Sequence, residues 1–359
     1  MKRIVLVAPG VAPPWTEGRK NFVRDLATML PELGCEVEII DGMQRRNETG
    51  ANGKLAPARA WSALRSRLDR DPMDTLVALF PYGRLSGYIG AINRLFLRTA
   101  RHTCDVRRVP HVSVFYSAAG VTLDALGRYA PALAVGREAP NVRPIHLCIP
   151  HADRTWKPST TPKRALFLCG YQHTTRAELE SVLNERGLRD LLRAGSTLVE
   201  LGLRLTIAIP FLRDPRMRDR LAAEVARLCP SLEVEMDGAT TPIDALCSHD
   251  LFVFPYRTEH AVFVPTSLLE AFSVGIPVVA ADHPMFAALT RDAGKARCGL
   301  HTPGDADDLG RAVATVVSDF GAAVTRAARA RVEIRETWTI RRSAEELLGT
   351  FAASPLARA

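Results

Sequence analysis

The stretch Leu251-Phe-Val-Phe-Pro-Tyr256 is followed by Pro265-Thr-Ser-Leu-Leu-Glu-Ala271 and then by Gly275-Ile-Pro-Val-Val-Ala-Ala281. The first and last of these stretches are short apolar runs, which are typical of strands buried on both faces of a parallel sheet. Proline suits the first positions of a helix, and the later glycine and proline end that helix before the second run. A strand, a helix and a strand in this order indicate a parallel α/β fold.

The same alternation extends outward through the chain. In the first half we expect strands at 4–8, 35–40, 75–80, 111–116, 132–135 and 145–149. In the second half we expect strands at 165–169, 203–209, 232–236, 251–255 and 277–280, with helices at 175–200, 216–228, 243–247, 268–274, 306–319 and 340–352. The pattern predicts two doubly wound Rossmann-like domains that face each other across a cleft, and the ligand is expected in that cleft.

The domain boundaries follow from a loop rich in proline, serine and threonine, Pro158-Ser-Thr-Thr-Pro162. We predict a first domain over 1–157, a second over 158–338, and a terminal helix and tail over 339–359. A length of 359 residues agrees with two domains of ordinary size.

The net charge of +8 comes from 47 basic and 39 acidic side chains. Residues 45–108 alone hold 13 basic and 5 acidic side chains, so this one segment carries the whole excess. A local excess argues against a nucleic-acid-binding coat and favours one anionic partner near this segment.

Seven scattered cysteines without a C-x-x-C pair predict buried free thiols in a reducing cytoplasm, and their spacing does not suggest zinc. The apolar run Ile4–Ala8 is too short for a signal peptide and reads as a first strand. Because no apolar stretch reaches the length of a membrane span, we expect a cytoplasmic protein that is at most peripheral on a membrane surface.

Common cofactor and catalytic motifs are missing from the sequence. The first strand is not followed by G-x-G-x-x-G, which makes NAD or FAD improbable, and the P-loop, H-E-x-x-H and G-x-S-x-G patterns do not occur. Asp305-Ala-Asp307 fits an acidic metal motif, but its position before an amphipathic run favours a helix N-cap with first-turn acids.

The helix that begins after Pro265 offers two kinds of binding group. Its first N–H groups lie at the expected cleft, where a diphosphate could bind. Glu270 lies about one turn further, and a carboxylate there can accept two hydrogen bonds from a vicinal diol such as a nucleotide ribose. The alternative for Glu270 is an acidic residue favoured near the helix start by the helix dipole.

This segment resembles the C-terminal signature of the GT-B glycosyltransferases, specifically the large retaining family 4. That signature reads approximately P-S-x-x-E-x7-E-A-M-A-x-G-x-P-V-V, and the matching residues here are Pro255, Glu259, Glu270-Ala271, Gly275 and Pro277-Val-Val279. Other fragments resemble the family in the expected order: Glu17-Gly18 to Gly34-Cys-Glu-Val37, Ile149-Pro-His-Ala-Asp153 to Pro158, Gly299-Leu-His-Thr-Pro-Gly-Asp305, Trp338, and Ala344-Glu-Glu-Leu-Leu348. The last two resemble the family's final helix, which crosses back to the N-terminal domain.

The resemblance implies roles by position. Gly18 would let the backbone approach the donor or acceptor, and Gly170 matches a donor-site glycine. Glu270 would bind the ribose, and Asp237-Gly238 would lie near the base. The amides of Thr266, Ser267 and Leu268 would face the diphosphate. The resemblance implies no cofactor and no metal, because basic side chains and helix dipoles stabilise the leaving diphosphate.

Several positions depart from the family pattern. Its cleft histidine falls at Tyr116, and Tyr116 or Ser117 could still hydrogen-bond an acceptor. Its G-R pair is Gly170-Tyr171 here, and its following lysine is represented at best by Arg176. Ten residues rather than seven separate Glu259 from Glu270, so the role of Glu259 depends on a longer loop.

Two sources for the lost cation are expected from the sequence. Arg257 follows the strand that precedes Glu270, and Arg19-Lys20 follow Gly18 in the first domain. For each residue at a departing position, and for each of these substitute cations, the alternative is a solvated surface residue without a role in binding or catalysis.

Residues 55–101 contain two arginine-rich amphipathic stretches. Trp61, Leu64 and Leu68 share one face of the first stretch, and Ile92, Leu95 and Phe96 belong to the second. Such helices can lie on an anionic membrane, which would suit a lipid-linked acceptor. The alternative is that their apolar faces pack on the sheet and their arginines are solvated.

The sequence therefore predicts a hexosyltransferase-type enzyme that moves a sugar from a nucleotide-diphosphate sugar to a carbohydrate or lipid-linked acceptor, with retention, in cell-surface polysaccharide or glycoconjugate synthesis. Two alternatives stay open. One is a non-catalytic GT-B relative that binds a nucleotide sugar or a partner protein. The other is a GT-B sugar-nucleotide epimerase that uses the same cleft without an acceptor.

Overall fold

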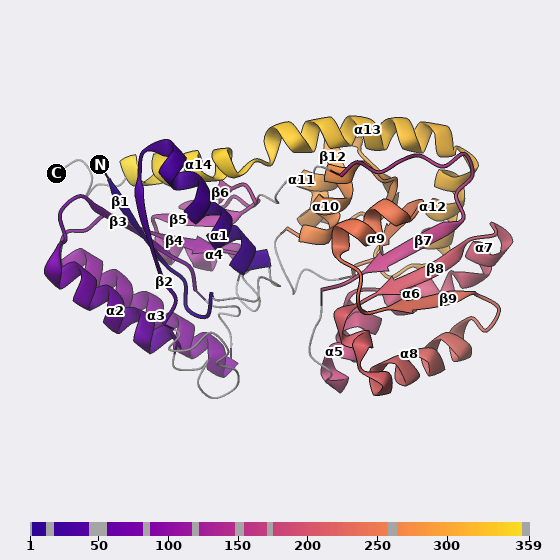
Figure 1. The fold of residues 1–359 in the computed structure, drawn as a ribbon, viewed down its shortest axis with the longest axis horizontal. Helices are drawn as coiled ribbons and strands as arrows, with labels where there is room; N and C mark the ends of the chain where they lie inside the picture. Colours follow the sequence, from indigo (N-terminus) through magenta and orange to yellow (C-terminus); the bar gives the residue numbers. More distant parts are fainter. Residues whose placement is uncertain are drawn as a thin grey trace. The chain divides into compact units, whose positions relative to one another are not determined.

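A computed structural model describes residues 2–11, 18–42, 56–81, 87–116, 122–147, 154–170, 175–257 and 264–353 (Figure 1). The described residues form two units. Those of Met1–Pro150 and Trp338–Ala359 make up the first, and those of His151–Glu259 and Val264–Thr337 make up the second. The chain therefore returns to the first unit at its C-terminal end.

The first unit contains a parallel sheet of six strands in the order β2-β1-β3-β4-β5-β6. The strands are β1 (Arg3–Val7), β2 (Glu36–Ile40), β3 (Thr75–Leu79), β4 (His111–Phe115), β5 (Ala132–Val135) and β6 (Val142–Ile145). The helical segments are α1 (Gly18–Met29), η1 (Leu30–Leu33), α2 (Ala56–Arg70), α3 (Gly87–Val106), α4 (Leu123–Leu126), η3 (Gly127–Tyr129) and the C-terminal α14 (Ile340–Ala352). β3 and β4 are buried along their whole length, as expected for strands covered on both faces.

The second unit contains another parallel sheet of six strands in the order β14-β11-β10-β7-β8-β9. The strands are β7 (Arg164–Leu168), β8 (Arg204–Ala208), β9 (Val234–Asp237), β10 (Leu251–Phe254), β11 (Val278–Ala281) and β14 (Gly299–His301). A short antiparallel pair, β12 (Arg291–Asp292) and β13 (Lys295–Ala296), lies outside this sheet. The strand order reverses between β7 and β10, which is the position where doubly wound sheets bind ligands.

The helical segments of the second unit connect these strands. They are α5 (Arg176–Glu180), η4 (Ser181–Glu185), α6 (Leu188–Arg193), α7 (Gly195–Glu200), η5 (Pro210–Arg213), α8 (Pro215–Leu228), α9 (Pro242–Ser248), α10 (Thr266–Val274), η6 (Pro284–Phe286), α11 (Ala287–Thr290), α12 (Ala306–Ser318) and α13 (Phe320–Thr337). α10 packs on α9 and α13, whereas α8 packs on α6 (Figure 1). The predicted α/β class with two Rossmann-like sheets is confirmed.

Some predicted elements differ from the structure. The single helix expected over 175–200 is wrong. Gly187, with a left-handed φ of 70°, separates α5 and η4 from α6, and Ala194 separates α6 from α7. The strand expected at 145–149 ends at Ile145, and residues 148 and 149 lie outside the described residues. The helix α13 and the edge strand β14 were not predicted.

Two other local predictions, the N-cap at Asp305 and the free thiols, are confirmed. Asp305 caps α12, since its side chain accepts a 2.9 Å hydrogen bond from the N–H of Asp308. All six cysteines in the described part of the chain are free, and five of them are buried. In the same part of the chain, no helix is long and apolar enough to cross a membrane.

The apolar faces of the arginine-rich helices are turned inward at the described positions. Leu64 and Leu68 of α2 and Phe96 of α3 are buried, and the indole N–H of Trp61 donates to Thr103 Oγ1 at 3.0 Å. Leu95 differs, because 63% of its surface is exposed. This packing favours the interpretation in which the apolar faces stabilise the first unit.

Candidate active site

The first turn of α10 provides backbone donors beside the reversal point of the second sheet. α10 begins directly after Pro265, which supplies no side-chain cap. The first backbone hydrogen bond of the helix runs from the N–H of Leu269 to the C=O of Pro265 at 3.2 Å. The N–H groups of Thr266, Ser267 and Leu268 come before it and have no acceptor within the helix. The helix start can therefore donate to an anion.

Glu270 follows this first turn. Its side chain is half-buried, and among the described residues its carboxyl group has no hydrogen bond and no ion pair. Burial raises the pKa of Glu270 from 4.5 to about 8, because no nearby cation offsets the cost of desolvating the carboxylate. A carboxyl group in this state is suited to a polar ligand that supplies hydrogen bonds.

The end of β10 is held by an aromatic and cationic stack. The ring of Tyr256 stacks on Phe254 with centroids 3.7 Å apart, and the guanidinium carbon of Arg186 lies 4.5 Å from the Tyr256 ring centroid. Next to β10, Gly170 follows β7, and a Cβ atom at Gly170 would meet no described atom within 4 Å. The backbone at the end of β7 is thus open to close approach.

Arg257 is tied to the segment that follows η4. Its guanidinium forms a two-pronged ion pair with Asp190, which is 1% exposed, and its backbone N–H donates to Glu185 C=O at 2.9 Å. A third contact reaches Gly304 C=O at 3.5 Å. The positive charge of Arg257 is therefore engaged by Asp190 in this structure, and its donor-binding role stays a prediction.

Asp237 and Gly238 lie where β9 ends. Asp237 Oδ1 accepts hydrogen bonds from the N–H groups of Ala239 at 2.7 Å and Thr240 at 3.1 Å. Burial alone would raise the pKa of Asp237. These hydrogen bonds lower the pKa by more than burial raises it, so the net shift is downward. Gly238 C=O accepts from Arg213 Nε at 2.7 Å, which fixes the turn after β9.

The predicted residues of the first unit lie at the carboxyl ends of its central strands. Tyr116 follows β4 and is buried, and Gly18 is the first residue of α1. Arg19 is also buried, and its guanidinium donates to Pro9 C=O at 2.9 Å and Phe80 C=O at 3.5 Å. Arg19 therefore joins the chain segments that follow β1 and β3. Ser117 and Glu259 lie outside the described residues.

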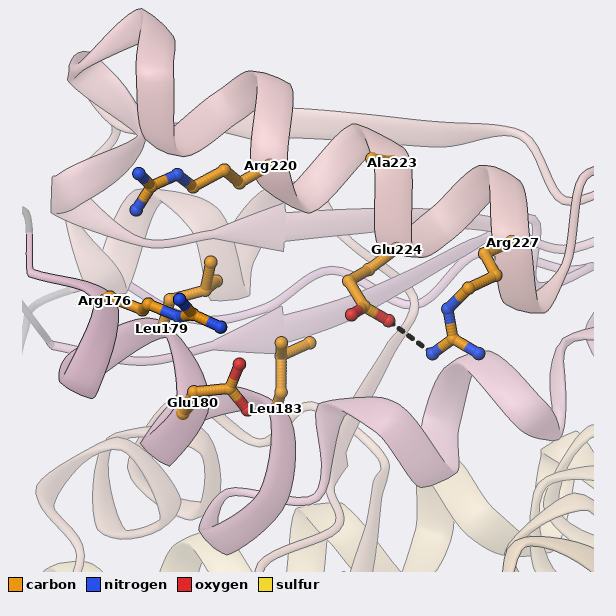
Figure 2. A pocket seen from close by; sticks show the side chains of 8 residues that line it. All are labelled: Arg176, Leu179, Glu180, Leu183, Arg220, Ala223, Glu224 and Arg227. Atoms are coloured by element: carbon orange, nitrogen blue, oxygen red, sulfur yellow. Dashed lines mark hydrogen bonds and ion pairs between the residues drawn. The ribbon is translucent and has the colours of Figure 1, made fainter.

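Arg176, the predicted substitute for the family's lysine, is the first residue of α5. It lines a pocket of about 370 Å³ between α5–η4 and α8, and its side chain and that of Arg220 reach into the same end of this pocket (Figure 2). None of the predicted donor-site residues on α10 lines this pocket. The structure therefore groups Thr266, Ser267, Leu268 and Glu270 on one helix and places Arg176 beside α8.

Three residues of this region were missed by the sequence analysis. Asp190 and Arg186 contact the loop after β10, and Arg220 lines the pocket with Arg176. Asp190 left no clear signal either, because the run Leu188-Arg-Asp-Leu-Leu-Arg193 places it beside two arginines, where an acid is ordinarily solvent-exposed. Arg186 and Arg220 look like ordinary solvated side chains in the sequence.

Metal ligands do not gather in the described part of the chain. Within it, no group of three or more His, Cys, Asp and Glu side chains could hold a metal ion.

Comparison with known proteins shows what most of the second unit is similar to. The model of the family described as Glycosyl transferases group 1 matches residues 164–319, from β7 through the end of α12. This segment therefore resembles the glycosyl transferases of group 1. No curated protein sequence matches the chain.

Solved structures resemble the whole chain. A glycosyltransferase from Rickettsia africae ESF-5 has 12% identity and a TM-score of 0.67, with 98% of each chain covered. Alr3699/HepE from Anabaena, solved in complex with UDP, has 14% identity and a TM-score of 0.65, with 99% of this chain and 100% of that chain covered. Sucrose-phosphate synthase (tll1590) from Thermosynechococcus elongatus has 13% identity and a TM-score of 0.68, with the same coverage. These similarities confirm the predicted GT-B fold, and the family match confirms the predicted likeness to glycosyl transferases group 1 for residues 164–319. Membership of family 4 and retention of configuration stay predictions.

Proposed function

We propose that this protein is a metal-independent hexosyltransferase that moves a sugar from a nucleotide-diphosphate sugar to an acceptor hydroxyl with retention of configuration. The observation that carries the proposal is Glu270, a half-buried carboxyl group without a described partner, placed behind the free N–H groups that begin α10. A nucleotide sugar offers a ribose diol and a diphosphate, which match these two groups.

Glu270 binds the ribose in this proposal. Ionising the carboxyl group in its present surroundings is costly, which is why its pKa is about 8. Two hydroxyl donors from a ribose would stabilise the carboxylate and offset that cost. The site thus favours a ligand that brings a vicinal diol to this position.

The diphosphate binds at the start of α10, where the amides of Thr266, Ser267 and Leu268 donate to its oxygens. Negative charge grows on this diphosphate as the bond to the sugar breaks, and fixed backbone dipoles stabilise that charge without reorganising. Gly170 lets the chain after β7 approach the donor, and the turn at Asp237-Gly238 lies near the base. Because Asp237 and Gly238 are held by hydrogen bonds, this turn is preorganised.

The acceptor binds to the first unit in this proposal. Gly18 is the first residue of α1, and Tyr116 lies at the carboxyl end of β4. Tyr116 or Ser117 orients the acceptor hydroxyl, and Glu259 acts on the sugar or the leaving diphosphate. Arg176, the other catalytic candidate of the sequence, lines the pocket beside α8 instead. Lys20 and Arg257 are further candidate cations.

Titration calorimetry with UDP and UDP-glucose tests the donor site, because UDP and UDP-glucose are the ligands of the similar Alr3699/HepE structures. A thermal-shift screen against GDP and ADP sugars covers the other bases. Glu270→Ala should abolish binding of the preferred nucleotide. Glu336→Ala removes an exposed carboxylate of α13 and should leave binding unchanged. Unchanged affinity in Glu270→Ala would refute the ribose assignment.

A non-catalytic nucleotide-sugar-binding protein is the second candidate. It is favoured by Tyr116, which stands at the position of the family's cleft histidine and is buried rather than open to solvent. Slow hydrolysis of the bound UDP-sugar supports the transferase, whereas binding without turnover supports the second candidate. Conversion to an epimeric UDP-sugar without any acceptor would instead identify an epimerase.

We place the enzyme in cell-surface polysaccharide or glycoconjugate synthesis, with the surface of α2 and α3 beside an anionic membrane. Leu95 is exposed on α3, and Arg98 and Arg70 are exposed on α3 and α2. Flotation with anionic vesicles at low salt tests this placement, with neutral vesicles as the control. If the protein stays with the soluble fraction in both cases, the membrane surface is excluded as a partner.

A further inference from the structure

The pocket between α5–η4 and α8 is built from two helical faces that oppose each other (Figure 2). On α5 and η4 the lining residues are Arg176, Leu179, Glu180 and Leu183, and on α8 they are Arg220, Ala223, Glu224 and Arg227. Each set is spaced at i, i+3, i+4 and i+7, which is one face of a helix. The first lining residue of each face is therefore an arginine, Arg176 on α5 and Arg220 on α8.

The acidic residues of the pocket are already neutralised. Glu224 accepts from Arg227 at 2.6 Å and from Arg189 at 3.4 Å, and hydrogen bonding to Arg227 is the main cause that lowers the pKa of Glu224. Glu180 lies 3.7 Å from Arg189 and accepts from Asn184 at 3.1 Å. These carboxylates therefore have cationic partners of their own.

Arg176 and Arg220 have no such partners among the described residues. Within the described part of the chain, neither guanidinium forms a hydrogen bond or an ion pair, although both reach into the same end of the pocket (Figure 2). Arg176 also lies in the first turn of α5, where the helix dipole disfavours a cation. Neither the dipole nor an ion pair accounts for two guanidinium groups that line the same end of the pocket, whereas a bound anion would account for both.

Apart from Arg227, which pairs with Glu224, the remaining lining is apolar. Leu179 and Leu183 are buried at the floor, and the volume of about 370 Å³ exceeds what a single small ion fills. Guanidinium groups match the geometry of phosphate oxygens, and an apolar floor accepts a ring or chain attached to that phosphate. The fitting ligand class is a small molecule that carries a phosphate group.

The pocket is connected to the loop after β10. Leu183 belongs to η4, a π-helical turn, and such turns are frequent at functional sites. Glu185 at the end of η4 accepts the 2.9 Å hydrogen bond from Arg257 N–H, and Gly187 packs directly under Pro255 C=O. The end of η4 and Gly187 thus contact Arg257 and Pro255, at the edge of the candidate donor site.

We propose that Arg176 and Arg220 form an effector site for a small phosphate-bearing anion, and that its occupancy changes donor binding through η4 and the loop after β10. The second clause rests on the proposed function. The first does not, because the pocket can be tested without a donor.

Calorimetry with inorganic phosphate and with glucose 6-phosphate tests the site directly, and sedimentation with phosphatidic acid vesicles distinguishes a lipid headgroup from a soluble source. Arg220→Gln removes one guanidinium from outside the predicted catalytic and donor residues, and loss of its charged hydrogen bonds should weaken binding about tenfold. Arg311→Gln makes the same charge change on the exposed surface of α12 and should bind within about twofold of the wild type.

The donor arm repeats the UDP titration with and without saturating glucose 6-phosphate. A shift in UDP affinity in the wild type that is lost in Arg220→Gln supports the coupling, and an unchanged affinity overturns it. Equal phosphate binding in the wild type and Arg220→Gln, or no binding of any probe, overturns the site. If UDP displaces the phosphate and Arg220→Gln loses UDP binding, the pocket belongs to the donor site and the proposal of a separate site is wrong.

Discussion

Glu346 accepts two hydrogen bonds from His146, a residue 200 positions earlier in the chain: one from the backbone N–H at 2.8 Å and one at the ring Nδ1 at 2.6 Å. Ser343 Oγ donates to His146 C=O at 2.6 Å, and the imidazole ring packs edge-on against Trp338, with centroids 5.0 Å apart. His146, which directly follows β6, therefore binds α14 through both its backbone and its side chain.

Glu346→Ala should lower the free energy of unfolding by about 1–3 kcal/mol, because it leaves the half-buried donors of His146 without their acceptor. Chemical denaturation followed by circular dichroism measures the change. Glu345→Ala is the matched control, since this neighbour on α14 is exposed and its carboxylate lies 3.9 Å from the Arg341 guanidinium. Equal losses in both variants would show that the contact with His146 contributes nothing specific.

Glu270 should make stability fall as the pH rises. Its pKa is about 8 in the folded protein and close to 4.5 when unfolded, so between these values the folded state holds a proton that the unfolded state has released. The contribution of Glu270 is therefore fully present below pH 4.5 and is lost by pH 8. Glu270→Gln removes this dependence, and its melting temperature should rise relative to the wild type between pH 5 and pH 8.5. A constant difference across this range would contradict the raised pKa.

The same titration should appear in donor binding. If a ribose stabilises the ionised form of Glu270, then UDP-glucose binding releases a proton, and affinity increases with pH by up to about tenfold per unit below pH 8. UDP-glucose is chosen because its diphosphate diester does not titrate in this range. Calorimetry in two buffers with different ionisation enthalpies measures the released proton. Glu270→Gln should release none, and proton release by that variant would assign the effect to another group.

Short apolar runs bounded by proline and glycine made the second sheet predictable. β10, α10 and β11 lie where the stretch 251–281 predicts them, because each run is long enough for only one strand and Gly275 ends the helix with a left-handed φ of 85°. The position of Glu270 behind the helix start follows from the same local pattern. Its lack of a partner does not, because it depends on side chains that other segments place around it.

The missed features depend on contacts between distant segments. α13 is rich in alanine and arginine, so its apolar face is weak in the sequence and becomes evident only through its packing on α10. The break at Gly187 arises because residues of the loop after β10 pack against it. The Arg176–Arg220 pocket needs α5 and α8 side by side, which no spacing within either helix reveals.

Gly187→Ala should destabilise the second unit more than an ordinary glycine substitution. Gly187 has a φ of 70°, and a Cβ atom there would lie 1.8 Å from the carbonyl oxygen of Pro255, so the backbone after β10 would have to move. The displaced loop carries Arg257, so we also expect a weaker Arg257–Asp190 pair and a loss of UDP affinity. Thermal unfolding and UDP titration measure the two effects.

Gly202→Ala separates strain from the clash. Gly202 has nearly the same φ, 68°, but a Cβ atom there meets nothing within 4 Å among the described residues. Its cost should be the left-handed backbone penalty alone, about 1–2 kcal/mol, with UDP affinity unchanged. Both variants add one methyl group at nearly the same backbone conformation. Any additional loss of stability in Gly187→Ala therefore measures the contact with Pro255. Equal losses in stability and in UDP affinity would mean that this contact does not hold the loop after β10 in place.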